Sequence, residues 1–221
     1  MSSPSQLVDV TKVPTFYRGL PWQRRALKYL AMTMDTATRQ HFTKLWRSGW
    51  HDILTEIVGR KVWKERGDDL TICFGRFEIE DPLEQAHFIA QTAHETGGYR
   101  WFLELASGEA YEGRSDLGNT QVGDGPKYKG AGAIQLTGRD NYRAFGDFLG
   151  DPEVLERGAV YVATKYPFTS AGFWWKRNVS PYLKASSTCR EVSSWVNGRD
   201  PANGLEDREW YFQKALEVLL V

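Results

Sequence analysis

The segment DPLEQAHFIAQTAHETGG, residues 81–98, specifies both ends of one helix. Asp81 can cap the first turn, Pro82 suits the first helical position, and Glu84 can complete a capping box. The two glycines at the far end can adopt the backbone conformation that terminates a helix. The sequence therefore predicts a helix that ends at Glu95 and is followed at once by a turn.

Helical spacing recurs on both sides of this segment. Apolar residues repeat at intervals of three and four in residues 21–59, in residues 142–149 and in residues 207–221. Residues 70–77 fit a helix and a strand equally well, and we expect a helix there. Residues 105–141 are rich in glycine and carry no long repeat, although GAIQLTG predicts a short extended segment. We therefore predict a mainly α protein with at most a small β-hairpin.

The composition is that of an ordinary globular protein, with 41% hydrophobic and 25% charged residues in a chain of 221. Nine tryptophans suit a core, and some can serve as flat platforms for sugars. No apolar run approaches the roughly 20 residues that cross a membrane, so we expect a protein that is not membrane-embedded. The N-terminus lacks the basic start and apolar centre of a signal peptide, which predicts synthesis in the cytoplasm.

Formal charges cancel over the whole chain but not along it. Residues 1–67 carry twelve Lys and Arg against five Asp and Glu, and the remainder carries sixteen against twenty-three. A net charge of zero argues against nucleic acid as a partner, while the basic N-terminal third forms either a solvated face or a contact with an anionic surface. In a chain without a signal peptide, we expect the two cysteines, Cys73 and Cys189, to be free and buried.

Glu95 stands where the helix of residues 81–98 ends. The C-terminal end of a helix carries partial negative charge, and Phe88 on the same helix face would exclude water. Both effects favour the protonated carboxyl group that a general acid needs. The plainer alternative is a solvent-exposed glutamate at the end of a helix.

Acid–base cleavage of a glycosidic bond requires a second carboxylate near the first. Glu104 and Glu112 are the candidates, because Glu104 interrupts the apolar segment WFLEL and Glu112 follows soon after in AYEGR. Glu112 could instead form an ion pair with Arg114, and Glu109 in the same loop fits a solvated side chain.

Other chemistries lack their motifs in this sequence. HETGG does not continue as a zinc-protease motif, because Gly98 stands where the second histidine would be, and the four histidines show no metal-ligand spacing. GDGPKYKGAG lacks the preceding strand and the Gly-Lys-Ser/Thr ending of a nucleotide-binding loop. We therefore expect no metal and no cofactor.

Three stretches of the chain, taken together, resemble glycoside hydrolase family 19. They are AHFIAQTAHETGG, ASGEAYEGRSDLGNTQVGDGPKYKGAGAIQLTGRDNY and WVNGRDPANGLEDREWYFQ. This chitinase-like family includes many phage endolysins and bacterial wall lysins. The resemblance covers residues 68–221 and implies a two-lobed, lysozyme-like fold with a cleft between the lobes. It also implies an inverting mechanism, in which a water molecule attacks the anomeric carbon.

The resemblance implies roles for individual residues by their position. Glu95 matches the general acid of the family. Glu104 matches the second essential glutamate of the phage-type members and is our preferred base. Glu112 is the nearest analogue of the plant-type base and stays open, with substrate binding as its other role. Five further positions are expected to line the cleft and bind substrate: Gln135, Thr137, Asn141, Asn197 and Arg208.

Two positions depart from the pattern of the family. Ala131 stands in KGAG, where the family usually has Lys-Gly-Arg-Gly, and Arg199 stands where its Asn-Gly-Gly motif has the second glycine. If the missing arginine holds a catalytic carboxylate, its loss would reduce activity or alter the substrate. Ala131 therefore keeps open a non-catalytic glycan-binding protein on the same fold.

The sequence as a whole predicts a glycosidase that hydrolyses the β-1,4 bonds of the amino-sugar backbone of peptidoglycan, with chitin as the alternative substrate. We expect a monomer with a catalytic domain at residues 68–221 and a basic helical region of separate or supporting role at residues 1–67. Such a protein would act on the cell wall after release or delivery by other means.

Overall fold

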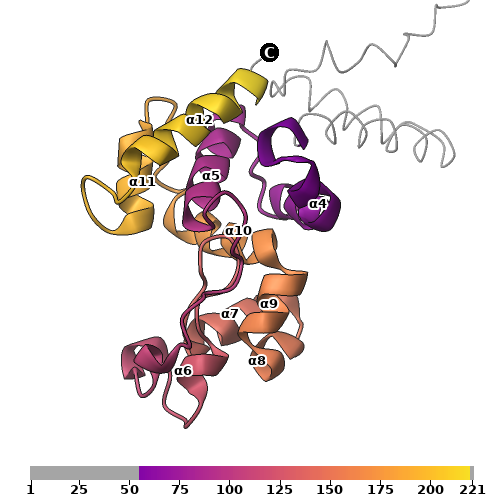
Figure 1. The fold of residues 1–221 in the computed structure, drawn as a ribbon, viewed down its shortest axis with the longest axis vertical. Coiled ribbons are helices and arrows are strands. Elements are labelled where there is room, and N and C mark those ends of the chain that lie inside the picture. Colours follow the sequence, from indigo (N-terminus) through magenta and orange to yellow (C-terminus); the bar gives the residue numbers. More distant parts are fainter. Residues whose placement is uncertain (1–54, 220–221) are drawn as a thin grey trace, which may run out of the picture.

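The computed structural model describes residues 55–219, and this part of the chain is built almost entirely of helices (Figure 1). Its β pairing is limited to two isolated bridges, which join Ala131 to Leu103 and to Leu136. The mainly α fold class predicted from the sequence is therefore confirmed. No helix within residues 55–219 is long and apolar enough to cross a membrane.

The upper lobe in Figure 1 is organised around α5. It contains α4 (Arg60–Arg76), α5 (Pro82–Glu95), α10 (Pro167–Asn178), α11 (Cys189–Asn197) and α12 (Leu205–Leu219). α11 and α12 pack against α5, and α10 packs against α4. Residues 85–93 of α5 are all buried, so this helix forms the centre of the lobe.

The lower lobe contains shorter elements. They are η2 (Glu109–Tyr111), η3 (Ser115–Leu117), α6 (Asp124–Lys127), α7 (Arg139–Leu149), α8 (Glu153–Arg157) and α9 (Ala159–Lys165). Asp151 joins several of them, because its carboxylate accepts hydrogen bonds from the hydroxyls of Tyr161 and Tyr166 and from Lys165. These hydrogen bonds lower the pKa of Asp151 to about 2, so the carboxylate stays ionised at neutral pH.

Two non-helical segments run between the lobes and pair with each other (Figure 1). The backbone N–H of Glu104 donates to the carbonyl of Gly130 at 2.9 Å, and that of Gly132 donates to Phe102 at 2.8 Å. This pairing fixes the position of the WFLEL segment relative to the KGAG segment.

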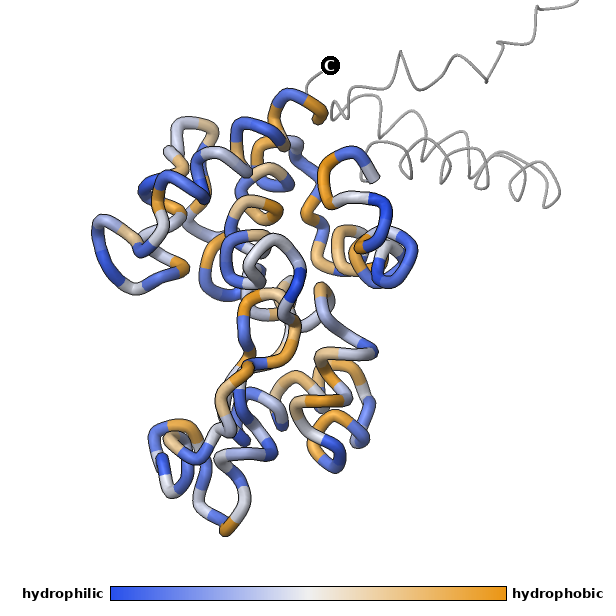
Figure 2. The backbone as a smooth tube through the Cα atoms, in the orientation of Figure 1, coloured by the Kyte–Doolittle hydropathy of each residue, from blue (hydrophilic) through white to orange (hydrophobic). Residues whose placement is uncertain are grey.

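Aromatic side chains fill the core of the upper lobe. Phe88 on α5 meets Phe74 on α4 and Trp175 on α10 edge to face, with ring centroids 5.5 and 5.3 Å apart. Hydrophobic and hydrophilic stretches alternate along the helices in Figure 2, as expected of helices with one buried face. Cys73 and Cys189 are both free and buried, as predicted.

The start of α5 confirms one prediction and corrects another. Asp81 caps the helix, since its side chain accepts from the backbone N–H groups of Leu83 and Glu84 at 2.9 and 3.3 Å. Glu84 does not complete a capping box. Its carboxylate instead accepts from the indole N–H of Trp175 at 3.0 Å and from Ser180 at 2.5 Å, because α10 lies within its reach.

The GAIQLTG segment was expected to be extended, and that prediction is wrong. Gln135 has a φ of +57°, and the backbone of Ala131 and Leu136 is joined by two hydrogen bonds of 3.1 and 2.8 Å. These residues therefore form a tight turn, not a strand. The ambiguous residues 70–77 are helical as predicted, forming the end of α4 with Phe77 as its cap.

The predicted helices before residue 55 lie outside the described residues. The last residues of the basic N-terminal region, 60–67, form the first turns of α4, and the same helix continues to Arg76. Helix α4 therefore belongs to both of the domains that the sequence predicted.

Candidate active site

Glu95 is the last residue of α5, and the way this helix ends fixes its position. The hydroxyl of Thr96 donates to the carbonyl of Thr92 at 2.6 Å, and the N–H of Gly98 donates to the carbonyl of Ala93 at 2.7 Å. Gly98 has a φ of +73°, which a glycine adopts at little cost. The chain therefore turns away directly after Glu95, and 25% of the Glu95 side chain stays exposed.

Arg208 on α12 contacts Glu95 directly. Its Nη2 donates to Glu95 Oε1 at 2.5 Å, its Nη1 donates to Gln91 Oε1 at 2.5 Å, and its Nε donates to the carbonyl of Asn203 at 3.0 Å. The Arg208 side chain is only 1% exposed, and a guanidinium so deeply buried requires such partners. Arg208 occupies Oε1 of Glu95, and Oε2 has no hydrogen-bond partner within residues 55–219.

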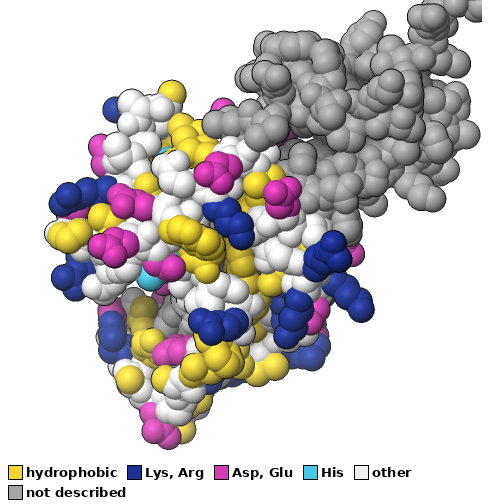
Figure 3. All heavy atoms as spheres, turned by 45° about the horizontal axis from the view of Figure 1, so that its top comes forward, with side chains coloured by type: hydrophobic (Ala, Val, Ile, Leu, Met, Phe, Trp, Pro, Cys, Tyr) yellow, Lys and Arg dark blue, Asp and Glu magenta, His cyan; other side chains and the backbone are white. Residues whose placement is uncertain are grey.

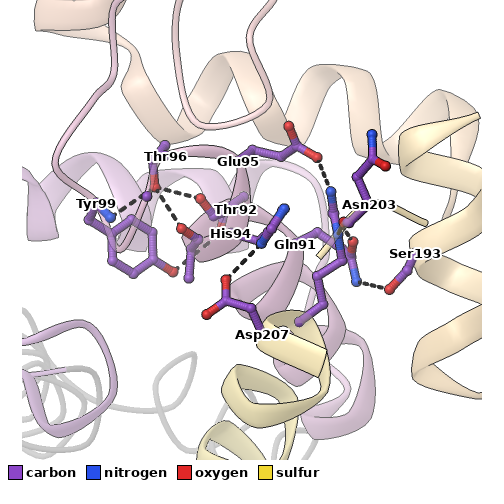
Figure 4. Close-up of polar contacts among 12 residues, drawn as sticks. Gln91, Thr92, His94, Glu95, Thr96, Tyr99, Ser193, Asn203 and Asp207 are labelled. Atoms are coloured by element: carbon purple, nitrogen blue, oxygen red, sulfur yellow. Dashed lines mark hydrogen bonds and ion pairs between the residues drawn. The ribbon is translucent and has the colours of Figure 1, made fainter. Parts of the chain in front are cut away.

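Two further residues hold the partners of Arg208 in place. The amide of Gln91 donates to the hydroxyl of Ser193 on α11 at 3.0 Å (Figure 4). The backbone N–H of Asn203 donates to Oδ1 of Asn197 at 2.8 Å. Of the residues predicted for this side of the cleft, Arg208 therefore reaches Glu95 directly, and Asn197 is connected to it through Asn203.

The surroundings of Glu95 differ from those expected from the sequence. Phe88 packs between Phe74 and Trp175 in the core, and the side chain in contact with Glu95 is the cation of Arg208. The structure thus places a positive charge beside Glu95, where the helix pattern had predicted an apolar side chain.

A second polar link lies beside the first. Nδ1 of His94 and Oδ2 of Asp207 are 2.7 Å apart (Figure 4). Consecutive residues of α5, His94 and Glu95, therefore contact consecutive residues of α12, Asp207 and Arg208. The ends of these two helices are held together by both pairs.

Glu104 lies on the segment between the lobes, and two donors hold its carboxylate. The hydroxyl of Tyr111 donates to Oε1 at 3.1 Å, and the backbone N–H of Gly130 donates to Oε2 at 2.8 Å. Burial and the hydrogen bond to Glu104 raise the pKa of Tyr111, so its hydroxyl keeps its proton and remains a donor at neutral pH.

Gln135 comes to the same place as Glu104. A Cβ atom added to Gly130 would lie 2.6 Å from Gln135 Oε1 and 3.0 Å from Glu104 Oε2, so both side chains close over this glycine. The amide of Gln135 donates to the carbonyl of Gly132 at 3.0 Å, which holds its oxygen toward Gly130. The turn that contradicts the predicted strand is therefore what brings Gln135 beside Glu104.

The other predicted cleft residues of this segment support the turn. The hydroxyl of Thr137 donates to the carbonyl of Gln135 at 2.8 Å, and the amide of Asn141 donates to the carbonyl of Thr137 at 2.7 Å. Their described hydrogen bonds reach neither Glu95 nor Glu104.

Glu112 is exposed and holds a loop. Its two oxygens accept the backbone N–H groups of Gly123 at 2.6 Å and Gly125 at 2.8 Å, at the start of α6. The expected ion pair between Glu112 and Arg114 does not form, because Arg114 pairs with Asp116 at 2.6 Å. Of the two candidate bases, Glu104 is the one that the structure brings beside another predicted site residue, Gln135.

Ala131, which stands where the family has an arginine, is completely buried. It lies in the bridges to Leu103 and Leu136, between the two segments that carry Glu104 and Gln135. The substitution therefore places a small apolar residue at the centre of the site's backbone pairing.

Comparison with known proteins gives relatives for this chain. No protein-family model matches it. A Haemophilus influenzae protein described as a glycosyl hydrolase family 19 domain-containing protein is 29% identical over 152 residues, covering 53% of this chain and 74% of that protein. An endochitinase of Arabidopsis thaliana is 34% identical over 139 residues, covering 62% of this chain and 48% of its own length. The chain thus spans about half the length of this plant endochitinase.

Solved structures share the fold. Chitinase C from Streptomyces griseus superimposes with a TM-score of 0.55 at 22% identity, covering 76% of this chain and 92% of that chain. A family 19, class IV chitinase from Zea mays gives 0.53 at 22% identity, covering 69% and 79%.

The chain is therefore similar in sequence to proteins named as glycoside hydrolase family 19 members and endochitinases, and similar in fold to family 19 chitinases. These relatives indicate a glycoside hydrolase, as the sequence motifs predicted, and the resemblance in fold to the chitinases is confirmed.

A groove of about 490 Å³ opens beside Glu104. Glu104 lines it together with three cations, Arg66, Arg100 and Lys129, and with several exposed apolar side chains. Another hollow, of about 380 Å³, lies between α4 and the start of α10, and neither Glu95 nor Glu104 lines it. Of the two candidate glutamates, Glu104 lines the first groove, and Glu95 is not among its lining residues.

Sequence reasoning missed several residues of this site. Gln91 could have been found, since it lies four residues before Glu95 and so on the same helix face. Tyr111 and Gly130 carry no sequence signal for their contacts with Glu104, because these depend on how the two segments between the lobes pair. Within residues 55–219, no group of three or more His, Cys, Asp and Glu side chains comes together as a candidate metal site.

Proposed function

We propose that this family 19 relative is a glycosidase that hydrolyses β-1,4 bonds in the amino-sugar backbone of peptidoglycan. The observation that carries the proposal is a pair of glutamates held in unlike surroundings. Glu95 contacts a buried cation, Arg208, whereas Glu104 accepts hydrogen bonds from Tyr111 and Gly130. Acid–base cleavage of a glycosidic bond uses two carboxyl groups, one as the acid and one as the base, and these two glutamates are the ones we assign to those tasks.

Glu95 is the general acid of the proposed reaction. Arg208 occupies Oε1, so Oε2 is the oxygen that carries the proton to the glycosidic oxygen. When the proton leaves, the guanidinium stabilises the carboxylate that remains. Partial exposure of the Glu95 side chain gives the substrate access to that oxygen.

Glu104 is the base. Its two neighbours are both donors, which suits an ionised carboxylate, and each oxygen keeps a lone pair for a water molecule. This water loses a proton to Glu104 and attacks the anomeric carbon on the face opposite the leaving group, so the configuration inverts. Gln135, beside Glu104, helps to hold the water and the sugar.

Chitin is the second candidate substrate. Several relatives are named endochitinases, and both polymers present β-1,4-linked N-acetylglucosamine units. The cations that line the groove beside Glu104 support peptidoglycan, because its muramic acid units carry acidic substituents and chitin is neutral. We propose that the protein acts on the cell wall after release or delivery.

The alternative function, which Ala131 leaves possible, is that of a protein that binds a glycan without cleaving it. The retention of Glu95, Glu104 and Gln135, each held by specific hydrogen bonds, supports catalysis instead. Binding alone would require none of the three.

Mass spectrometry of the reducing ends released from purified peptidoglycan, beside a chitin hexasaccharide, tests the proposal. New reducing ends from peptidoglycan are expected, and their identity gives the bond that is cleaved. Proton NMR during the first turnovers should show the α-anomer if the mechanism inverts. Cleavage of the chitin oligosaccharide alone would assign the chain to chitin, and cleavage of neither polymer would favour the non-catalytic rival.

A further inference from the structure

We propose that the groove beside Glu104 recognises the free carboxylates of the lactyl-peptide substituents of peptidoglycan. Arg66, Arg100 and Lys129 are the residues assigned to this task, and we call this surface the cationic groove. The inference rests on the proposed function, because it names the feature by which that same site selects an acidic glycan over a neutral one.

The three cations are held in place without being neutralised. Arg66 donates to the carbonyl of Thr164 at 3.1 Å, Arg100 to that of Gly97 at 2.7 Å, and Lys129 to that of Ala106 at 2.7 Å. None of the three forms an ion pair with an acidic side chain in the part of the chain that the structure describes. A carbonyl uses one donor of each side chain, so further N–H groups remain for a ligand.

The charge balance of the cationic groove favours an anion. Glu104 is the one acidic side chain among the described residues that line it, against three cations. The Glu104 carboxylate already accepts hydrogen bonds from Tyr111 and Gly130 and so needs none of these cations as a partner. An anionic ligand therefore meets a surface of net positive charge next to the proposed base.

Apolar side chains between the cations suit the remainder of such a ligand. Trp101, Leu105 and Val160 are 50%, 74% and 64% exposed. An exposed indole can stack on a sugar ring, and aliphatic side chains can contact the methyl groups of lactyl and alanyl units. On the face of the molecule shown in Figure 3, Lys and Arg side chains likewise border exposed hydrophobic atoms.

These features separate the two candidate polymers by chemistry. A chitin strand offers the groove sugar rings and neutral acetamides. A peptidoglycan strand offers carboxylates in addition, and guanidinium groups bind carboxylates through paired, charge-assisted hydrogen bonds. The cationic groove should therefore contribute affinity for peptidoglycan that chitin does not receive.

The test measures binding by isothermal titration calorimetry with the full chain carrying Glu95→Gln, so that no turnover interferes. The ligands are soluble, uncrosslinked peptidoglycan strands, and the same strands with their carboxylates converted to carboxamides. At low salt, we expect the native strands to bind about tenfold more tightly or better, since each charge-assisted contact is worth on this order. The preference should weaken as salt is added.

Two double substitutions, each added to the Glu95→Gln chain, test whether the preference for native strands arises from the cationic groove. Arg100→Gln with Lys129→Gln should remove most of it, and Arg66 is left intact because its guanidinium also packs over the Phe102 ring, 4.9 Å from the centroid. The matched control, Arg60→Gln with Lys184→Gln, changes two exposed cations that do not line the groove, and it should keep the preference.

Equal binding of native and amidated strands would overturn the inference. So would a folded Arg100→Gln/Lys129→Gln variant that keeps the full preference. The proposed function is tested separately, by measuring hydrolysis with the unaltered chain. Cleavage without the binding preference would remove only the groove assignment, and the preference without cleavage would contradict only the proposed hydrolysis.

Discussion

Arg208 uses all three of its side-chain nitrogens on Glu95, Gln91 and the carbonyl of Asn203. A side chain committed in this way, and 1% exposed, positions the carboxylate and does not bind sugar itself. The sequence motif predicted substrate binding for Arg208, and from the buried ion pair we propose instead that it holds the acid.

Glu95→Gln should keep the fold and lose nearly all hydrolysis. The glutamine can still accept from Arg208 but has no proton to give, and general acid catalysis contributes on the order of 10²–10⁴-fold. Steady-state kinetics on peptidoglycan strands, with circular dichroism to confirm folding, provides the measurement. Glu109→Gln, in an exposed position, is the control that should retain activity, and near-normal turnover by folded Glu95→Gln would refute the assignment.

Glu104→Gln and Glu112→Gln should fail in different ways. We expect Glu104→Gln to lose most of kcat, because it removes the base. Glu112→Gln should keep kcat but lower stability by about 1 kcal/mol, because its amide cannot accept both the Gly123 and Gly125 N–H groups equally well. Turnover numbers and urea unfolding midpoints of the two variants show which of the two glutamates is the base. If Glu112→Gln were the inactive one, the base would be Glu112.

At the scale of elements, the pairing of the WFLEL and KGAG segments sets the geometry around Glu104, the proposed base. Gly130→Ala tests this, since its new Cβ would meet the ends of Gln135 and Glu104, which can move aside. We expect a folded protein whose kcat falls several-fold or more because the base is displaced. Gly75→Ala on α4 is the matched control: its Cβ meets nothing within 4 Å, and the change should leave kcat unaltered and add about 0.5–1 kcal/mol of stability. Equal kinetics for the two variants would show that the contact over Gly130 is unimportant.

How far the sequence predicts these elements depends on the range of the interactions. The Asp81 cap and the glycines after Glu95 are local signals, and both ends of α5 were predicted correctly. The turn at Gln135 was missed, because two alternating apolar residues resemble a strand and only the pairing with Ala131 closes the turn. Glu84 was misread for a different reason, because its partners Trp175 and Ser180 lie about 90 residues away in the chain.

At the scale of the whole molecule, stability should depend on pH through His87. This side chain is fully buried and stacks on Phe212 of α12, with ring centroids 4.3 Å apart. Burial lowers its pKa from 6.5 to about 4. Between these values the unfolded chain binds a proton that the folded chain does not, so stability is full above pH 6.5 and falls as the pH drops toward 4.

His87→Leu should flatten that dependence. From the shift, the loss between pH 7.5 and pH 4.5 is about 2–3 kcal/mol in the unaltered chain, and the variant should lack this component. Urea unfolding at the two pH values, compared between variant and parent, measures the difference. The same pH dependence in both would mean that other groups, such as paired carboxylates, are responsible.

Glu95 and Arg208 are 113 positions apart in the chain, and this separation has a consequence for how the protein is made. Helix α5 leaves the ribosome well before α12, so these contacts cannot form until α12 has been synthesised. Until α12 docks, the carboxylate of Glu95 lacks its counter-charge and the second link through His94 and Asp207 is absent. The acid of the proposed reaction therefore gains these positioning contacts only once α12 has been made and has docked on α5.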